Sequence, residues 1–420
     1  MFTTMKLFRP RFLLILGLAL SVPALFGAGR IREIAPGGPA PDVSAKAVVI
    51  MDDATGTILY AKNPDEPIPP ASLTKLVTLD VVYDELAAGR LSRSQLVTID
   101  PRDCSPIIPL GSSIMYLRPG MHVSILDLMQ GTAVVSGCDA AFALARAVSG
   151  SSEAFAKLMN ADVQAKGLTA LHFVEPSGLS EKNMVTARQF ADFCRSYLRD
   201  HPESIAELHS LHYIDFPRPE HATKDFIPKG RTLQFNRNNL VLDYPGCDGL
   251  KTGYIVESGF NLAATAERDG TRFIIVTLGG SGSSSSGGGS IRASDGAKLL
   301  DWSFANWKTE TPRVPDIPAI RAWYGAKARV ALAPSAALAV TLPNAELGDL
   351  SVRAEIDASV VAPVSKGEKL GEVIYTSGST VVRRVDLVAS SDVARGNIFV
   401  LIHDALERFF RSIFAPRSQV

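Results

Sequence analysis

Apolar and polar positions follow two different spacings along this chain, and each spacing predicts a different kind of element. Between residues 71 and 198 apolar residues recur every three or four positions, which is typical of amphipathic helices. On both sides of this region, and again from residue 328 to residue 390, they occur in short runs bounded by turn residues, which favours β-strands. The pattern predicts a first unit of helices framed by sheet, followed by a small β-rich unit.

The elements expected in the first unit can be placed by their boundaries. The first helix carries apolar residues from Leu76 to Leu86, and Gly89 ends it. Further helices are expected at Ile125–Val135, Asp139–Val148, Ser152–Lys166 and Ala187–Leu198. Strands are expected at Ala47–Met51, Ile58–Ala61, Gly249–Ile255, Asn261–Glu267 and Arg272–Leu278. Turn residues join the first two strands and also the last two, so each of these pairs predicts an antiparallel hairpin.

The second half of the chain changes character. Ser281–Ser290 contains only serine and glycine and predicts a flexible loop, after which Ala297–Trp307 predicts a helix. The prolines of Lys308–Pro318 indicate a domain boundary. The β-rich unit beyond it contains the runs Val330–Leu332, Leu338–Leu342, Val352–Ile356, Leu370–Tyr375 and Val381–Leu387. The expected fold is therefore α/β, of the α+β kind, followed by a small all-β domain.

Both ends of the chain carry patterns associated with membranes. Lys6, Arg9 and Arg11 precede an apolar run at Phe12–Val22, and small residues follow it. This order is typical of a secretory signal peptide, and the run is short for a membrane span. An uncleaved N-terminal anchor is the alternative. At the other end, Asn397–Phe414 predicts an amphipathic helix. Its apolar face consists of Ile402, Leu406, Phe409, Phe410 and Ile413.

Composition and charge exclude some classes of function. Among 420 residues, 43 Lys and Arg balance 43 Asp and Glu, so no basic excess indicates binding to nucleic acid. The four cysteines are Cys104, Cys138, Cys194 and Cys247. None of them has metal-ligand spacing, so we expect no metal site, although export would permit disulfides in any of three full pairings. His209 and His212 lack the glutamate of a metalloprotease motif, which favours surface or packing roles.

The first motif with candidate chemistry consists of Ser72 and Lys75, which share one face if a helix begins near the serine. A serine hydroxyl needs a nearby base to act as a nucleophile. A lysine amine can be that base when burial and neighbouring cations lower its pKa. The helix N-terminus adds an electropositive environment for a developing oxyanion. Taken alone, the pattern is common and favours a solvated pair on a helix surface.

The second motif is Ser136-Gly137-Cys138, at the end of an apolar helical run. The hydroxyl of Ser136 can pass a proton between a lysine and a leaving amine. Taken alone, the tripeptide indicates no more than a turn between two helices.

The third motif is Lys251-Thr252-Gly253, on the first of the late strands. A lysine and a threonine on a strand can bind a substrate carboxylate, and a glycine lets a substrate backbone approach the strand edge. A phosphate-binding loop is excluded, because Leu250 stands where that motif requires glycine. The alternative is an ordinary edge strand with a solvated lysine.

Ser-x-x-Lys, Ser-x-Asn and Lys-Thr-Gly, in this order, form the signature of penicillin-binding proteins and serine β-lactamases. The chain resembles the low-molecular-mass D-alanyl-D-alanine carboxypeptidases of that superfamily over roughly residues 47–304. The surrounding segments agree as well: Pro70–Leu76, Asp139-Ala140, Pro176–Leu179, Asn236–Asn238 and Asp248–Tyr254. The resemblance implies a penicillin-binding, β-lactamase-like domain with an antiparallel sheet flanked by a helical cluster.

The resemblance also implies a role for each matching residue. Ser72 would be the acylated nucleophile, Lys75 its general base and Ser136 a proton relay. Lys251 and Thr252 would hold the terminal carboxylate of the substrate. The implied partners are peptidoglycan stem peptides ending in D-Ala-D-Ala, and also penicillin, which would acylate the serine as a substrate mimic. No cofactor is implied.

Two further features of the site follow from the family pattern. The backbone N–H groups of Ser72 and Tyr254 would form the oxyanion hole, beside Gly253. Cys138 stands where the family usually has asparagine. Cysteine forms only weak hydrogen bonds, so this change bears on substrate preference and on deacylation, and we expect the thiol to be free in the cleft.

Several activities stay open within and beyond the carboxypeptidase prediction. A transpeptidase or an endopeptidase would use the same residues. A β-lactamase needs a group that activates water. Glu175-Pro176 superficially resembles the glutamate segment of class A enzymes, but the residues after it do not continue that pattern. The alternative outside the enzymes is a catalytically silent protein that binds the cell wall. The intact Ser72, Lys75, Ser136 and Lys251 argue against this alternative.

These observations divide the chain into five segments. They are a signal peptide at 1–28, a linker at 29–46, a catalytic domain at 47–311, a small β-sandwich-like domain at 319–392 and a tail at 396–420. The tail is expected to hold an exported enzyme on the outer face of the cytoplasmic membrane. The alternative is a helix docked on the β-rich unit.

Overall fold

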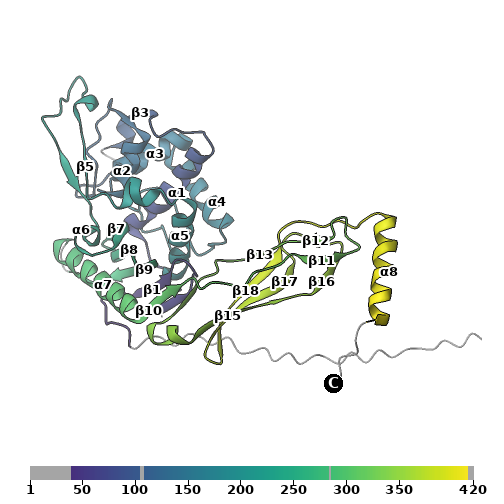
Figure 1. The fold of residues 1–420 in the computed structure, drawn as a ribbon. Helices are drawn as coiled ribbons and strands as arrows, with labels where there is room; N and C mark the ends of the chain where they lie inside the picture. Colours follow the sequence, from purple (N-terminus) through teal and green to yellow (C-terminus); the bar gives the residue numbers. More distant parts are fainter. Residues whose placement is uncertain (1–38, 105–107, 283–284, 415–420) are drawn as a thin grey trace, which may run out of the picture.

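The computed structural model describes residues 39–104, 108–282 and 285–414. These residues form a larger mixed part, an elongated β-rich part beside it and a helix at the far end (Figure 1). The predicted signal peptide at 1–28 lies outside the described residues.

A five-stranded antiparallel sheet forms the centre of the larger part, in the order β2-β1-β9-β8-β7. Its strands are β1 (Ala47–Asp52), β2 (Ile58–Lys62), β7 (Cys247–Ile255), β8 (Gly259–Arg268) and β9 (Thr271–Gly280). The hairpin expected between β8 and β9 is confirmed, with both turn residues, Asp269 and Gly270, at positive φ. The strand β7 lies at one end of this order, so one of its edges is left for other partners.

Alternate residues of each strand face two different cores, as the pleat of a strand requires. Val49 and Met51 of β1 pack in the core on one face, and Val48 and Ile50 pack in the core on the other. The first face is covered by α1 (Thr74–Ala87), α2 (Ile125–Ala133), α3 (Cys138–Ser149), α4 (Ser152–Ala165) and α5 (Ala187–Asp200). The second face is covered by α6 (Asn239–Asp243) and α7 (Ser285–Asn306). The expected fold class is confirmed.

Some strands and helical turns are too short to show a repeating apolar pattern in the sequence. The short strands form two antiparallel pairs, which are β3 (Leu96–Thr98) with β4 (His122–Ser124), and β5 (Tyr213–Asp215) with β6 (Leu233–Phe235). The short helical turns are η1 (Ala71–Leu73), η2 (Pro101–Asp103), η3 (Ile205–His209), η4 (Pro219–His221) and η5 (Asn344–Asp349). Two of these turns, η1 and η3, lie against the strand β7.

The prediction of a flexible loop through Ser290 is wrong, because α7 already begins at Ser285. Glycine and serine are poor helix formers, so tertiary contact has to compensate. A Cβ on Gly288 would lie 1.9 Å from the ring of Phe260, and one on Gly296 would lie 2.7 Å from Leu262. Only glycines therefore let the helix axis come this close to β8. The glycines that predicted a flexible loop therefore serve close packing of α7 against β8.

The described end of the predicted linker packs against the larger part. Val43 and Ala45 are buried in the second core. Ser44 donates from its backbone N and its hydroxyl to Asp295 of α7, at 2.8 and 2.6 Å. Residues 39–46 thus cover an edge of the domain before β1 begins.

The smaller part contains the strands β10 to β18. They are β10 (Trp307–Glu310), β11 (Ile320–Trp323), β12 (Arg329–Val330), β13 (Leu332–Pro334), β14 (Val340–Pro343), β15 (Leu350–Ile356), β16 (Ser359–Val361), β17 (Lys369–Ser377) and β18 (Thr380–Ala389). They form sheets in the orders β13-β18-β17-β15, β12-β11-β16 and β10-β14. Trp307 of β10 packs in the second core of the larger part. The pairing of β10 with β14, together with a 2.8 Å hydrogen bond between Thr55 and Thr341, therefore joins the two parts.

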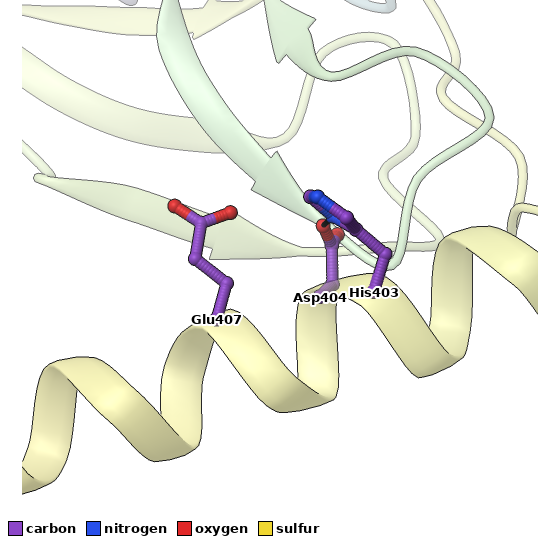
Figure 2. Close-up of side chains that lie close together, drawn as sticks. All are labelled: His403, Asp404 and Glu407. Atoms are coloured by element: carbon purple, nitrogen blue, oxygen red, sulfur yellow. Dashed lines mark hydrogen bonds and ion pairs between the residues drawn. The ribbon is translucent and has the colours of Figure 1, made fainter.

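The terminal helix α8 (Ile398–Phe414) is attached to the smaller part by one polar edge. Figure 2 shows Asp404 and Glu407 pointing from α8 toward the strands. Arg321 of β11 donates to both carboxylates, at 2.6 and 3.2 Å, and the backbone N–H of Tyr324 donates to Asp404 at 2.6 Å. His403 completes a trio with ligand-type atoms within 4.8 Å of one another. Asp404 accepts from Arg321 and Tyr324, and Glu407 accepts from Arg321 and Arg411. Since both carboxylates already have partners within the chain, we assign this cluster to docking of the helix.

Candidate active site

The first motif is built on a single buried amine. Ser72 lies in the turn η1, and Lys75 lies in the first turn of α1 and is fully buried. The Nζ of Lys75 donates to the Oγ of Ser72 at 3.0 Å, to the Sγ of Cys138 at 3.4 Å and to the carbonyl O of Ser177 at 2.5 Å. One lysine thereby joins the candidate nucleophile to the second motif.

Two glycines allow other segments to touch the turn that carries Ser72. A Cβ on Gly178, whose φ is +82°, would lie 1.9 Å from the carbonyl O of Ala71. A Cβ on Gly253 would lie 2.7 Å from the carbonyl O of Pro70 and 3.0 Å from the backbone N of Ser72. From the sequence, we expected Gly253 to let the backbone of a substrate approach the edge of the strand. The space left by its missing Cβ is filled by the turn of the serine.

The second motif forms the connection between α2 and α3. Ser136 is buried and has a φ of +63°, a left-handed conformation that non-glycine residues rarely adopt. At the end of the motif, the backbone N–H of Cys138 donates to the carbonyl O of Ser113 at 2.9 Å. The carboxylate of Asp139 accepts from the backbone N–H groups of Met115 and Leu117, at 2.7 and 3.0 Å. The segment 113–117 is thus fixed beside the second motif.

The third motif lies on β7 and places a second lysine in the same region. Lys251 is 1% exposed, and its Nζ donates to the carbonyl O of Thr252 at 2.9 Å. Burial lowers the pKa of Lys251 well below its ordinary value, and repulsion from Lys75 and then Arg292 lowers it further. Among the described residues, no carboxylate pairs with Lys251. A ligand carboxylate would supply a negative partner for its ammonium.

The three motifs meet at one cleft of about 1220 Å³. Its wall includes Ser72, Ser136, Cys138, Thr252, Gly253 and Tyr254. The two lysines lie behind this wall, since both are almost fully buried. The ring of Tyr254 is 44% exposed and stacks on Phe260, with ring centroids 4.4 Å apart. All eight residues singled out in the sequence are therefore brought into or directly behind a single cleft.

Two cationic residues of the cleft wall were given no role in the prediction from the sequence. Arg292 of α7 donates to the carbonyl O of Gly253 at 3.4 Å, and Arg237 also lines the cleft. Burial lowers the pKa of Arg292 to about 10, so its guanidinium stays charged at neutral pH. The segment of Arg292 looked like the end of a loop, and a single arginine carries no periodic signal. These side chains make the cleft more electropositive and suited to an anionic ligand.

The carboxylate of Glu175 is fully engaged by its own loop. It accepts from the backbone N–H groups of Ser177 and Gly178 at 2.6 and 2.7 Å, and from the side-chain amide of Asn183 at 2.9 Å. These bonds shape the loop whose Ser177 carbonyl accepts from Lys75. The acid is thus a part of the scaffold, and it is not among the residues that line the cleft.

All four cysteines are free, and Cys138, Cys194 and Cys247 are buried. None of the three disulfide pairings left open by the sequence is formed. The expectation of a free thiol at Cys138 is confirmed.

Comparison with known families decides the classification. The sequence profile for D-alanyl-D-alanine carboxypeptidase matches residues 35–282. This chain belongs to the D-alanyl-D-alanine carboxypeptidase family. A second profile, for the C-terminal domain of penicillin-binding protein 5, matches residues 316–395, which cover the strands β11 to β18. The resemblance inferred from the motifs is confirmed over both parts of the chain.

Relatives in this carboxypeptidase family are similar over nearly their whole length. The D-alanyl-D-alanine carboxypeptidase DacC of Escherichia coli is 33% identical over 404 residues, which are 94% of this chain and 94% of that protein. DacA of Haemophilus influenzae is 32% identical over 89% of this chain and 92% of its own. The crystal structure of penicillin-binding protein 5 from H. influenzae superposes with a TM-score of 0.72 at 33% identity, covering 86% of this chain and all of that one.

A structural relative of the carboxypeptidase family bears on the unusual cysteine. The DD-transpeptidase of Streptomyces K15 has a TM-score of 0.56 and 26% identity, covering 63% of this chain and 99% of its own. It has been solved with a cysteine changed to asparagine, and separately with a serine two positions earlier changed to alanine. Its natural sequence thus has a serine and a cysteine at the spacing of Ser136 and Cys138.

Proposed function

We propose that this protein is a serine-type D-alanyl-D-alanine carboxypeptidase that removes the terminal D-alanine from peptidoglycan pentapeptide stems and is acylated by penicillins. The observation that carries the proposal is the 3.0 Å hydrogen bond between Lys75 and Ser72, at the wall of a cleft shared with the other two motifs. The family to which the chain belongs supports the same activity.

Acylation would proceed by transfer of one proton and exchange of one bond. The Oγ of Ser72 attacks the carbonyl carbon of the penultimate D-alanine while Lys75 accepts the hydroxyl proton. The backbone N–H groups of Ser72 and Tyr254 stabilise the oxyanion, and Lys251 and Thr252 hold the terminal carboxylate. The peptide C–N bond then breaks, and Ser136 relays the proton from Lys75 to the leaving amine.

Deacylation would need water as the second reactant. Water attacks the ester carbon of the acyl-enzyme while Lys75 accepts one of its protons. The ester bond to the Oγ of Ser72 then breaks, Lys75 returns the proton to this oxygen, and the shortened stem leaves with a new carboxylate. In a penicillin the broken amide belongs to a ring, so the amine stays attached to the acyl group. Such a product does not diffuse away, which would make the penicillin ester longer-lived than the peptide ester.

Mass spectrometry of reaction products tests the proposal. Purified protein incubated with a stem pentapeptide should release one D-alanine and leave a tetrapeptide. With an added acceptor amine, the tetrapeptide should still be the main product. Amide formation with the acceptor as the main product would instead identify a transpeptidase, and an unchanged pentapeptide would contradict both activities.

The transpeptidase is the second candidate function, and Cys138 is the observation that favours it. A DD-transpeptidase with the same Ser-x-Cys spacing is among the structural relatives. A thiol gives water fewer hydrogen bonds than an amide does, which would favour an amine acceptor over hydrolysis. Cys138→Asn should therefore shift the products toward the free tetrapeptide if this candidate holds.

The hypothesis of a β-lactamase receives little support. A β-lactamase needs a free group that activates water on the acyl-enzyme. Glu175 does not offer one, because its carboxylate accepts hydrogen bonds from Ser177, Gly178 and Asn183. The silent wall-binding reading is disfavoured because Lys75 and Ser72 are in hydrogen-bonding contact.

The lowered pKa of Lys251 predicts a loss of substrate affinity at alkaline pH. Only the ammonium form attracts a carboxylate, and this form is lost as the pH rises through a pKa that lies below the ordinary 10.5. A bound carboxylate favours the ammonium, so kcat/KM should fall at a lower pH than kcat does. Rates measured from pH 6 upward check this order. Lys251→Arg, which keeps its charge, should move the fall in kcat/KM to higher pH.

We further propose that the five segments inferred from the sequence describe an exported enzyme held at a membrane surface. The signal peptide at 1–28 would direct export, and the tail at 396–420 would bind lipid on the outer face of the cytoplasmic membrane. Among the described residues, no helix is both long and apolar enough to cross a bilayer. The apolar side of α8 is 53–78% exposed, at Ile398, Phe399, Ile402, Leu406, Phe409, Phe410 and Ile413. Since the opposite edge docks through Asp404, this face is presented outward, as an interfacial helix requires.

Removal of residues 396–420 tests the membrane part of the proposal. The full mature chain should sediment with phospholipid vesicles, and the truncated chain should stay in the supernatant. Acylation by penicillin in solution should be the same for both, because α8 docks on the smaller part. Sedimentation of the truncated chain would contradict a membrane role for the tail.

A further inference from the structure

A buried histidine outside the three motifs contacts the strand that carries Lys251 and Thr252. His209 ends the turn η3, is 1% exposed and lies in the core between α5 and β7. Its Nδ1 is 3.2 Å from the carbonyl O of Leu250, and its Nε2 is 2.9 Å from the hydroxyl of Tyr197. From the sequence we expected only a surface or packing role for this histidine.

The chemistry of the two partners fixes the tautomer of this histidine. A carbonyl oxygen can only accept, so Nδ1 must carry the proton that it donates to Leu250. Burial lowers the pKa of His209 to about 3, and the ring is therefore neutral. The unprotonated Nε2 then accepts from the hydroxyl of Tyr197. Each polar atom of the ring has one partner with one defined direction.

The contact acts on the edge of β7 that faces the cleft. In an antiparallel strand, alternate residues direct their backbone groups to the same edge. Leu250, Thr252 and Tyr254 therefore share an edge, while β7 pairs with β8 through its other one. His209 occupies this shared edge at Leu250. The next positions along it are the ones assigned to the substrate carboxylate and the oxyanion hole.

Further contacts hold the histidine and the strand together. A Cβ on Gly249 would lie 3.2 Å from the Cβ of His209, so only glycine permits this approach without displacement. The side-chain amide of Asn236 donates to the carbonyl O of His209 at 3.2 Å, and that of Asn238 donates to the carbonyl O of Gly249 at 3.0 Å. The backbone N–H of Asn238 donates to the Oδ1 of Asn236 at 2.9 Å, which links the two asparagines.

We infer that His209 is a positioning residue, which sets the edge of β7 through its bond to Leu250 and so aligns Lys251 and Thr252 for the carboxylate of the substrate. Its effect on catalysis passes through the strand, since it is not among the residues that line the cleft. The inference rests on the proposed function for the identity of the ligand. The contact with the strand is independent of that identity.

Two substitutions separate positioning from packing. His209→Asn keeps an amide N–H at the place of Nδ1 but loses the acceptor for Tyr197. His209→Leu loses both and leaves the carbonyl of Leu250 without this donor. For His209→Leu we expect kcat/KM for a D-Ala-D-Ala peptide to fall about tenfold or more, the cost of one unsatisfied buried carbonyl. The change should lie mainly in KM. His209→Asn should recover most of the loss, and the control His212→Leu, at an exposed neighbour, should resemble wild type.

Thermal unfolding and hydrogen exchange provide the readouts that activity alone cannot. If the role is only structural, kcat/KM should follow the melting temperature, and the asparagine and leucine variants should be equally impaired. That result would overturn the inference, as would normal kinetics of His209→Leu. Amide exchange of residues 250–254 should accelerate in His209→Leu and much less in His209→Asn. Because exchange needs no substrate, a wild type inactive on D-Ala-D-Ala peptides would refute the proposed function and leave this test in place.

Discussion

Ser72→Ala should abolish both acylation by a fluorescent penicillin and release of D-alanine from a pentapeptide. The serine Oγ is the atom to which the substrate would be bonded, and alanine has no atom to replace it. Loss of a covalent nucleophile typically costs about 10⁴-fold or more in rate. Gel fluorescence after labelling and the rate of D-alanine release measure the two effects.

The control for this prediction removes a different hydroxyl from the same cleft. Ser112 lines the cleft wall, and Ser112→Ala should keep the label and the activity. Equal melting temperatures of the two variants would show that the loss is chemical. Persistent labelling of Ser72→Ala at the wild-type rate would place the nucleophile elsewhere and refute the assignment.

Lys75→Met should slow acylation by about 10²–10⁴-fold, the usual contribution of a general base. Methionine fills a volume similar to that of lysine in this buried site, but it cannot accept the proton of Ser72. It also removes the hydrogen bonds from Nζ to Cys138 and to the carbonyl O of Ser177. Stopped-flow measurement of the penicillin acylation rate should show the loss, while noncovalent affinity for the penicillin should change little.

The exposed Lys157 of α4 supplies the matched control, and Lys157→Met should acylate at the wild-type rate. A Lys75→Met variant within tenfold of wild type would show that another group takes the proton. The acylation rate of Ser136→Ala would then be measured next, because the hydroxyl of Ser136 is the other group assigned to proton transfer.

The sequence alone predicted most elements whose amphipathic pattern is long enough to repeat. The helices α2 to α5 and the strands of the central sheet lie within a few residues of their expected positions. The three-residue strands β3 to β6 were missed, since a period of two cannot be recognised in so short a run. The start of α7 was missed for a different reason. Its glycines reduce helix propensity locally, and their benefit, close contact with Phe260 and Leu262, involves residues distant in sequence.

The candidate site divides in the same way. Ser72, Lys75, Ser136 and Lys251 could be named from motif order, because each motif keeps its residues at short fixed spacings. Arg292 could not be named, since a lone arginine in a glycine-rich segment carries no local signal. His209 was noticed but given a packing role, because its partners Tyr197 and Leu250 are known only once α5, η3 and β7 come together.

By itself, the sequence determined which side chains are available for acyl transfer and which segments form helices and strands. Both depend on local spacing, which the covalent chain sets directly. Only the tertiary structure decided that Lys75 contacts Ser72 and Cys138 at once, that Gly253 makes room for the turn of the serine, and that Glu175 is occupied by its own loop. These facts depend on burial and on contacts between remote segments, which arise when the two faces of the sheet exclude water.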